Sequence, residues 1–306
     1  MRMRAINGFA IVTLLFLLTG VARAVDQRTF ASPTAAVAAL MQATESGNQE
    51  EMLAIFGDSG KNLVYSGDPV QDKKSRESFV KSYNTKHSIV PDGDEMVLQV
   101  GPNNWPMPIP LVNDGGKWRF DTAAGEQELV YRRIGHNELG AIAVCRGYIS
   151  AQQDYAAAGH DGLPAGLYAQ KLVSDPGQQN GLYWETAEGE TPSPSGPFLA
   201  NAGGEGYSGT GLGSKSQPYH GYLYRILKAQ GPAAKGGAKN YLADGKLSGG
   251  VALVAFPAQY RVSGVMTFII DKDGVVYQKN LGEQTPALAD AMTTFNPDST
   301  WTKVTD

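Results

Sequence analysis

The stretch SGVMTFIIDKDGVVYQKNLG, residues 263–282, consists of two apolar runs on either side of Asp-Lys-Asp-Gly. Runs rich in β-branched and aromatic residues that are bounded by turn residues are typical of β-strands. Glycine readily adopts the positive φ that a tight bend requires, and Gly274 stands where the bend is expected. We therefore predict a β-hairpin with its turn at residues 271–274, which marks an antiparallel sheet near the end of the chain.

The same four residues could instead form a calcium loop or a catalytic pair of acids. A helix-loop-helix calcium site needs a third acidic position and a bidentate glutamate at the end of its loop, where this chain has Gly282. Asp271 and Asp273 at a solvent-facing turn would also lack the burial that separates the pKa values of a catalytic acid and base. A hairpin turn is therefore the favoured interpretation.

Further strand and helix signals precede this hairpin. The runs at 222–226 and 249–260 have the alternation or the β-branched content of strands. Upstream, apolar residues at helical spacing predict one helix at 126–133, a break at Gly135 and a longer helix at about 137–158. The second half of the chain should therefore be a long helix followed by an antiparallel sheet.

The first half reads as helices followed by strands. Ser32 before Pro33 is a helix start signal, and apolar spacing predicts further helices around 52–56 and 72–83. The β-rich runs that follow lie at 95–101, 107–114 and 115–123, with a hairpin around Asn113-Asp114-Gly115-Gly116. This order is α+β, and so is the predicted class of the whole chain.

Residues 1–24 have the three parts of a secretory signal peptide. Arg2 and Arg4 precede an apolar stretch, and Ala22 and Ala24 form an Ala-x-Ala cleavage pattern. The apolar stretch is shorter than the roughly 20 residues of a membrane-spanning helix. We expect cleavage after Ala24, a periplasmic or secreted mature protein, and no stable membrane insertion.

Charge and cysteine content exclude several classes. Removal of residues 1–24 takes away three arginines and no acid, so the formal net charge changes from −4 to −7. Such a chain has no electrostatic reason to bind nucleic acid. Cys145 is the single cysteine, so no intramolecular disulfide can form. Its place among apolar residues at helical spacing indicates that the thiol is buried.

Two segments of the first half, SPTAAVAALMQATESGNQEEMLAIFG and PIPLVNDGGKWRFDTA, resemble the nuclear-transport-factor-2-like, or cystatin-like, cone, in which a curved sheet wraps a helix. The resemblance implies a domain at residues 25–134 with a pocket between helix and sheet. The residues expected to line it are Tyr65, Asp68, His87, Trp105, Trp118 and Asp121. The alternative is that the tryptophans belong to the core, that His87 lies on the surface and that Asp121 caps the next helix.

The segments AIAVCRGYISAQQDYAA and SGVMTFIIDKDGVVY are similar to the globular part of type IV pilin-like proteins, where a long helix lies against an antiparallel sheet. The resemblance implies a pilin-like domain at residues 135–306. Pilins form filaments through a long apolar segment at the start of that helix. This segment is missing here, so the resemblance does not extend to filament formation.

A set of motifs spans nearly the whole mature chain: SGDPV, WPMPIPLV, GGKWRFDTAAG, RRIGHNELGAI, GLYW, PYHGY and GVMTFIIDKDGVVYQKNLG. Together they are similar to a bacterial exported family of unknown function, domain-of-unknown-function family 2950. The family implies no reaction. Where its members tend to have an acid-rich loop, this chain has AGHDGLPAGLYAQ with Asp161 as its one acid, so no calcium site is implied there.

Marks of metal or nucleophilic chemistry are missing from the sequence. The histidines are His87, His136, His160 and His220, and no pair has metal-ligand spacing. There is no nucleophile elbow and no phosphate-binding loop. No metal or cofactor is therefore expected. Residues 185–218 are rich in Gly, Pro and Ser and have the composition of a long loop.

The strongest polar constellation places His220 beside Tyr219 and Tyr222, with Glu205 as a candidate acid. Histidine is the commonest general base, so these are the candidate catalytic residues. Aromatic residues beside a histidine could also bind a small molecule or a glycan. The alternative is a tyrosine cluster that packs the neighbouring Gly-rich segment.

These observations favour a non-catalytic periplasmic binding or assembly protein of the cell envelope, with an envelope protein or glycan as its partner. One alternative is a hydrolase or lyase that acts on an envelope metabolite or glycan and uses His220 or an Asp/His pair of the cone. A second alternative is a structural component derived from pseudopilins.

Overall fold

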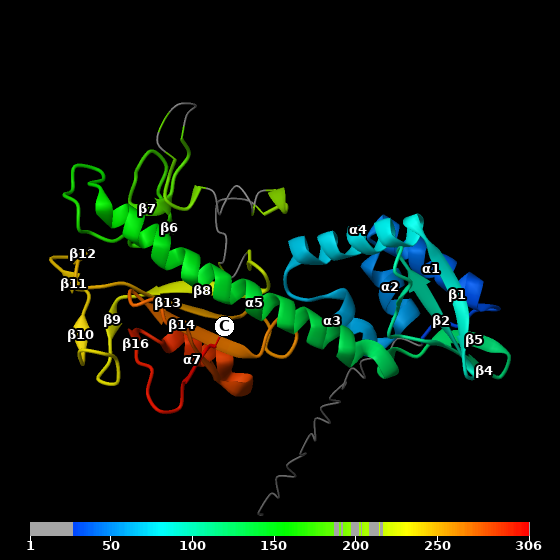
Figure 1. Ribbon diagram of the computed structural model, residues 1–306. Coiled ribbons are helices and arrows are strands. Elements are labelled where there is room, and N and C mark those ends of the chain that lie inside the picture. The colour runs from blue at the N-terminus through cyan, green and yellow to red at the C-terminus, as the bar shows by residue number, and fades with distance from the viewer. Residues whose placement is uncertain are drawn as a thin grey trace, which may run out of the picture.

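The computed structural model describes residues 27–186, 190, 192–196, 202, 204–207, 214 and 217–305. The expected signal peptide and most of the predicted loop at 185–218 lie outside these residues. Figure 1 shows a first unit (residues 27–120) and a second unit (residues 158–305) joined by helix α5, Thr122–Ala157. Each unit has helices and an antiparallel sheet, which confirms the predicted α+β class.

Short helices make up the start of the first unit. They are α1 (Pro33–Ser46), α2 (Gln49–Phe56), the 3-10 turn η1 (Asp58–Gly60), α3 (Lys61–Val64) and α4 (Pro69–Thr85). Helix α1 begins as predicted, because the Ser32 hydroxyl accepts the Ala35 amide at 3.1 Å. Helix α4 begins three residues before the predicted position, because Asp68 caps it and a proline suits its first turn.

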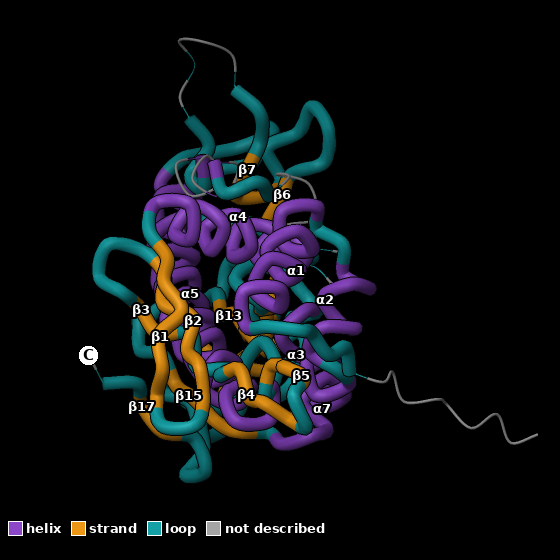
Figure 2. The backbone as a smooth tube through the Cα atoms, turned by 90° about the vertical axis from the view of Figure 1, so that its right-hand side faces the viewer, coloured by secondary structure: helices purple, strands orange, loops and turns teal. Residues whose placement is uncertain are grey.

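The sheet of the first unit has the strand order β1-β2-β4-β5, with β3 also paired to β2. The strands are β1 (His87–Asp92), β2 (Glu95–Val100), β3 (Trp105–Pro106), β4 (Leu111–Asp114) and β5 (Lys117–Phe120). The predicted hairpin joins β4 to β5, and Gly115 and Gly116 have φ values of 59° and 86°. Figure 2 views the first unit from its end and shows α1, α2 and α4 grouped beside the long β1–β2 ladder.

Helix α5 is continuous, so the predicted break at Gly135 is wrong. A glycine inside a helix costs only about 1 kcal/mol relative to alanine, and packing on both sides of Gly135 exceeds that cost. Before it, Val130 and Ile134 are buried. Beyond it, Ala141 and Cys145 belong to the core of the second unit.

The main sheet of the second unit has the order β17-β15-β14-β13-β8. Its strands are β8 (Tyr222–Leu227), β13 (Ala252–Pro257), β14 (Met266–Asp271), β15 (Tyr277–Asn280) and β17 (Thr302–Lys303). All six residues of β13 are buried. One face packs against α5, and the other packs against α7 (Thr285–Ala291) and nearby segments. This explains the nearly continuous apolar sequence of the strand.

Smaller elements complete the second unit. They are β6 (Lys171–Val173), β7 (Gly181–Tyr183), β9 (Ala229–Gln230), β10 (Lys239–Asn240), β11 (Leu242–Ala243), β12 (Lys246–Leu247), η2 (Gly282–Gln284) and β16 (Thr294–Phe295). Strands β6 and β7 pair in parallel, and β16 pairs in parallel with β9. These short ladders surround the main sheet without extending it.

The hairpin predicted from the opening stretch joins β14 to β15, and Gly274 has the expected positive φ of 78°. The expectation that both acids lie at a solvent-facing turn is wrong. Asp271 is 7% exposed, and burial raises the pKa of its carboxyl. Lys235 lowers the pKa of Asp273. The strand continues to Asp271, so this residue belongs to the covered sheet and only the next residues form the turn.

Cys145 lies on the face of α5 that covers the second sheet, and it is fully buried as predicted. Burial raises the pKa of its thiol to about 12, so it is not a reactive thiolate at neutral pH. Among the described residues, no helix has the length and apolar content needed to cross a bilayer.

Candidate functional site

A cavity of about 400 Å³ lies in the first unit between α1, α2, α4 and the start of α5. We refer to it as the α4 cavity. Its apolar lining residues are Leu40, Met52, Phe56, Leu63, Val64, Phe79, Trp105, Met107, Ile109 and Leu129. Ligand pockets are mostly apolar and have volumes from about 300 Å³ upward. The α4 cavity therefore has the size and the lining of a small-molecule site.

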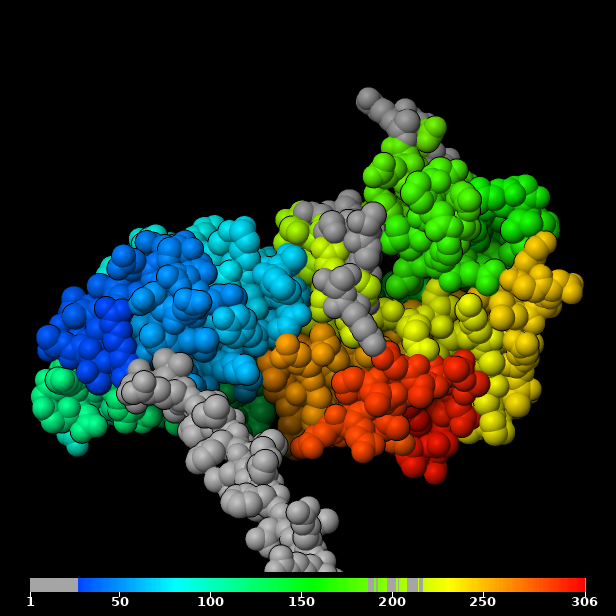
Figure 3. Space-filling model, turned by 180° about the vertical axis from the view of Figure 1, so that it is seen from behind, coloured from blue at the N-terminus to red at the C-terminus, as the bar shows by residue number. Residues whose placement is uncertain are grey.

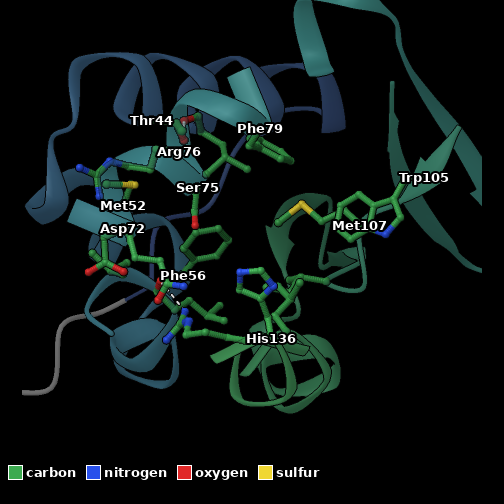
Figure 4. Close-up of a pocket in the computed structure, with 17 residues that line it drawn as sticks. Thr44, Met52, Phe56, Asp72, Ser75, Arg76, Phe79, Trp105, Met107 and His136 are labelled. Carbon is green, nitrogen blue, oxygen red and sulfur yellow. Dashed lines mark hydrogen bonds between the residues drawn. The ribbon is translucent and has the colours of Figure 1, made fainter. Parts of the chain in front are cut away.

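Polar side chains form the rest of the cavity wall. They are Thr44, Gln71, Asp72, Ser75, Arg76, Arg133 and His136. Figure 4 shows Arg76 and Asp72 at one end and Trp105 at the other, with Phe56 and His136 between them. A molecule that fills the cavity would therefore contact charged groups at one end and apolar groups at the other.

The charged groups of the cavity are not paired with one another. Arg76, Arg133 and Asp72 take part in none of the ion pairs formed among the described residues. Arg133 instead donates to the carbonyl oxygens of Asn62 and Leu63 at 2.6 and 3.2 Å. Burial lowers the pKa of Arg133 and raises the pKa of Asp72. Arg133 thus lies within electrostatic reach of Asp72 and Glu126 but forms no ion pair with either of them.

Gln71 contributes an unused hydrogen-bond acceptor to the cavity wall. Its Nε2 donates to Asn137 Oδ1 at 2.7 Å, and Asn137 Nδ2 donates to the Ser263 carbonyl oxygen at 2.8 Å. Gln71 Oε1 is buried, and no donor from the described residues reaches it. Buried acceptors normally have a partner, so this oxygen is a position where a ligand can donate a hydrogen bond.

Of the residues predicted to line a pocket, Trp105 lines the α4 cavity. Tyr65 and Trp118 are half-buried and pack against the apolar core of the first unit. His87 is exposed at the start of β1, and Asp121 precedes α5 without a side-chain capping bond. These four residues do not line the cavity, because most of its wall comes from helices and not from the sheet.

Asp68, the remaining predicted pocket residue, connects the two units. It is 1% exposed, and its Oδ1 accepts the Gln71 amide at 3.0 Å. Its Oδ2 accepts the Tyr207 hydroxyl at 2.8 Å and the Gly221 amide at 3.1 Å. The cap of α4 is therefore also a contact with the second unit. Figure 3 shows from behind how closely the two units meet.

His220 lies at this contact because of an unusual turn. The amides of Tyr219 and Tyr222 each donate to the other's carbonyl oxygen, and His220 and Gly221 have φ values of 49° and 70°. Positive φ at both central residues is typical of a type I′ turn. The turn holds the His220 ring 4.1 Å from the Tyr219 ring and its Nε2 3.9 Å from Glu205 Oε2.

Three of the four candidate catalytic residues therefore meet, namely His220, Tyr219 and Glu205. We refer to these three with Asp68 and Tyr207 as the junction cluster. Tyr222 does not belong to it, because its side chain is fully buried and its hydroxyl donates to the Met266 carbonyl oxygen at 2.8 Å. Burial raises the pKa of Tyr219 to about 12, so its hydroxyl is protonated at neutral pH.

His136 connects the α4 cavity to the junction cluster. It lines the cavity, and its ring meets the His220 ring edge to face with centroids 6.1 Å apart. The 3.9 Å between His220 and Glu205 exceeds hydrogen-bond length, so the pair is not set for proton transfer in this arrangement. Within the described part of the chain, no group of three His, Cys, Asp or Glu side chains can hold a metal ion.

The cavity residues that sequence reasoning missed are Asp72, Ser75, Arg76, Arg133 and His136. A signal for them does exist. Asp72, Ser75 and Arg76 are three and four positions apart, and so are on one face of α4, while Arg133 and His136 are three apart on α5. The spacing of residues within each helix does not show that the α4 face and the α5 face line the same cavity, because the two are more than fifty residues apart in the chain.

The buried position of His220 predicts a pH-dependent stability. Burial lowers the pKa of its imidazole, an effect that Glu205 opposes. The unfolded chain therefore takes up a proton at about pH 6.5, before the folded chain does, and stability should fall as the pH drops from 7 to 5. His220→Asn, which tolerates the positive φ, should reduce that fall. The urea midpoints of the wild type and the variant at pH 7 and pH 5 give the loss of stability in each protein. An equal loss in the two proteins would contradict the prediction.

A family model described as "Protein of unknown function (DUF2950)" matches residues 27–304. The match covers both units and α5, and it confirms the family resemblance of the motifs quoted above. No curated protein and no solved structure matches the chain.

Proposed function

This chain belongs to the DUF2950 family, and we propose that it is a non-catalytic binding protein of the cell envelope. The α4 cavity takes a small molecule. The proposed location rests on the three-part pattern of residues 1–24. Under this proposal the exported protein begins at Val25, which N-terminal sequencing would reveal.

The observation that carries the proposal is the α4 cavity itself. Its floor is apolar, and α4 contributes no fully buried residue although it covers one side. A helix that only half-buries its apolar residues leaves space beneath it that a ligand can fill. A ligand in this space would remove further apolar surface from water, which stabilises the complex by about 25 cal/mol for each Å² buried.

A hydrolase or lyase is the second candidate, and the junction cluster supports it. His220 is uncharged at neutral pH because burial lowers its pKa, which is the state a general base needs. A bound substrate would have to bring His220 and Glu205 closer than their present 3.9 Å. His220→Asn and Glu205→Gln would then abolish turnover of an envelope metabolite or glycan. Unchanged turnover in either variant would remove this candidate.

The pilin-derived alternative has less support. The first turns of α5 pack against η1 and α3 of the first unit. A pilin-type filament needs that end of the helix to be free for stacking against other copies. We therefore do not propose filament assembly.

The binding proposal predicts that the protein takes up N-phenyl-1-naphthylamine, a neutral apolar fluorophore, and that blocking the cavity prevents uptake. Ser75 lines the cavity and is exposed to solvent, so Ser75→Trp should fill the space without disturbing the core. We expect at least a tenfold loss of affinity, about 1.4 kcal/mol. Fluorescence titration measures it.

Ser78→Trp is the matched control, because Ser78 is also exposed on α4 but does not line the cavity. It should bind the fluorophore like the wild type. Both variants should keep the wild-type free energy of unfolding within about 0.5 kcal/mol. Failure of the wild type to bind, or equal binding by Ser75→Trp, would refute a binding role for this cavity.

A further inference from the structure

We propose that the ligand of the α4 cavity is an amphipathic monoanion, with an aliphatic body among the apolar residues and a carboxylate head between Arg76 and Arg133. This inference rests on the proposed binding function and specifies its ligand class. It follows from the unequal distribution of charge along the cavity and from the unpaired state of the charged groups.

The first step concerns the direction of the ligand. Arg76 and Asp72 lie at one end and Trp105 at the other (Figure 4). The deep part of the lining is apolar, with Ile109 fully buried and Met107 6% exposed. A molecule with a polar group at both ends would leave one of them without a partner in this apolar part, which is costly. One polar head and one apolar body is the matching pattern.

The second step concerns the sign of the head group. Arg76 and Arg133 supply two positive charges to the wall and Asp72 supplies one carboxyl group, while Glu126, which does not line the cavity, also acts on Arg133. None of the three forms an ion pair among the described residues. Guanidinium groups bind carboxylates through two parallel hydrogen bonds. An anionic head would therefore pair with Arg76, whereas a cationic head would add a third positive charge to the wall.

The third step concerns Asp72, the group that opposes an anion. Burial raises the pKa of its carboxyl, whereas hydrogen bonds from Ser66 and the charge of Arg133 lower it. Its Oδ2 already accepts the Ser66 amide at 3.1 Å, which directs the carboxyl toward the backbone. Arg76 forms no hydrogen bond or ion pair with any residue that the structure describes, so it remains available to the head group.

The test uses three probes of the same chain length at submicellar concentration: decanoate, 1-decanol and decylammonium. Each is titrated against the complex with N-phenyl-1-naphthylamine, and the displacement of the fluorophore gives its affinity. We expect decanoate to bind about tenfold more tightly than 1-decanol. Decylammonium should bind most weakly. If 1-decanol or decylammonium equals or exceeds decanoate, the monoanion class is refuted while the cavity remains a binding site.

Two variants locate the head group. Arg76→Gln should weaken decanoate about tenfold and leave 1-decanol unchanged, because it removes charge without changing the apolar wall. Lys81→Gln is the control for net charge, since Lys81 is exposed on α4 away from the cavity, and it should change neither affinity. Equal losses in both variants would refute the placement of the head beside Arg76. If neither the fluorophore nor any probe binds, the proposed function itself fails, which is a distinct outcome.

Discussion

Replacement of Asp68 by alanine is expected to lower the free energy of unfolding by about 3 kcal/mol. The capping bond to the Gln71 amide contributes about 1 kcal/mol. The Tyr207 hydroxyl and the Gly221 amide would each lose a buried acceptor, at about 1 kcal/mol or more for each group. Because Tyr207 and Gly221 belong to the second unit, the loss should also weaken the contact between the units. Urea unfolding followed by circular dichroism measures the change.

Two variants separate the capping bond from the contact between the units. Ser32 caps α1 through a single bond to the Ala35 amide, so Ser32→Ala should cost only about 1 kcal/mol. Asp68→Asn keeps the volume of the side chain but has one oxygen for three donors. Its loss of unfolding free energy should therefore lie between the losses of Ser32→Ala and Asp68→Ala. If Asp68→Ala costs no more than Ser32→Ala, the bonds to Tyr207 and Gly221 do not stabilise the fold.

The position of Asp68 also connects stability to the proposed binding site. It stands one turn before Gln71 and Asp72 and two turns before Ser75, and all three line the α4 cavity. The same start of α4 is thus anchored to the second unit and forms the polar end of the cavity. His136 and Gln71 extend this arrangement, because each contacts both the cavity and residues near the contact between the units.

Local sequence signals predicted many individual elements but fewer of the contacts between them. The N-terminal cap of α1, the Gly-Gly hairpin and the β14–β15 hairpin each depend on a few adjacent residues, and all three were predictable. The Tyr-His-Gly-Tyr turn was different. Its sequence indicated that His220 and Tyr219 are neighbours, but not that Asp68, more than a hundred residues away, binds the same turn.

The wrong predictions for Gly135 and Asp271 have a common physical cause. Gly135 was predicted to end a helix, and Asp271 was predicted to be exposed, because glycine and aspartate have those preferences in isolation. Tertiary packing overrides both. Buried residues on either side of Gly135 keep α5 continuous. Asp271 is the last residue of β14, and the segments packed around the sheet bury it with the rest of the strand.

Two of the four glycines of α5, Gly125 and Gly135, should respond in opposite ways to alanine. A Cβ on Gly125 would lie 2.1 Å from the Pro108 carbonyl oxygen and 2.7 Å from the Ile109 amide nitrogen. Neither backbone atom can move without shifting the segment that leads into β4. Gly125→Ala should therefore lower the free energy of unfolding by about 2–3 kcal/mol, the cost typical of overpacking a core.

Gly135→Ala is the matched control in the same helix, because a Cβ there meets nothing within 4 Å. Alanine is the better helix former, so this variant should gain up to about 1 kcal/mol. Urea unfolding of the two variants and the wild type measures both changes. A loss in Gly135→Ala would mean that α5 is not a continuous helix at this position. Wild-type stability in Gly125→Ala would mean that the start of α5 does not pack against the Pro108 backbone, and therefore that the wall of the α4 cavity is not held by this contact.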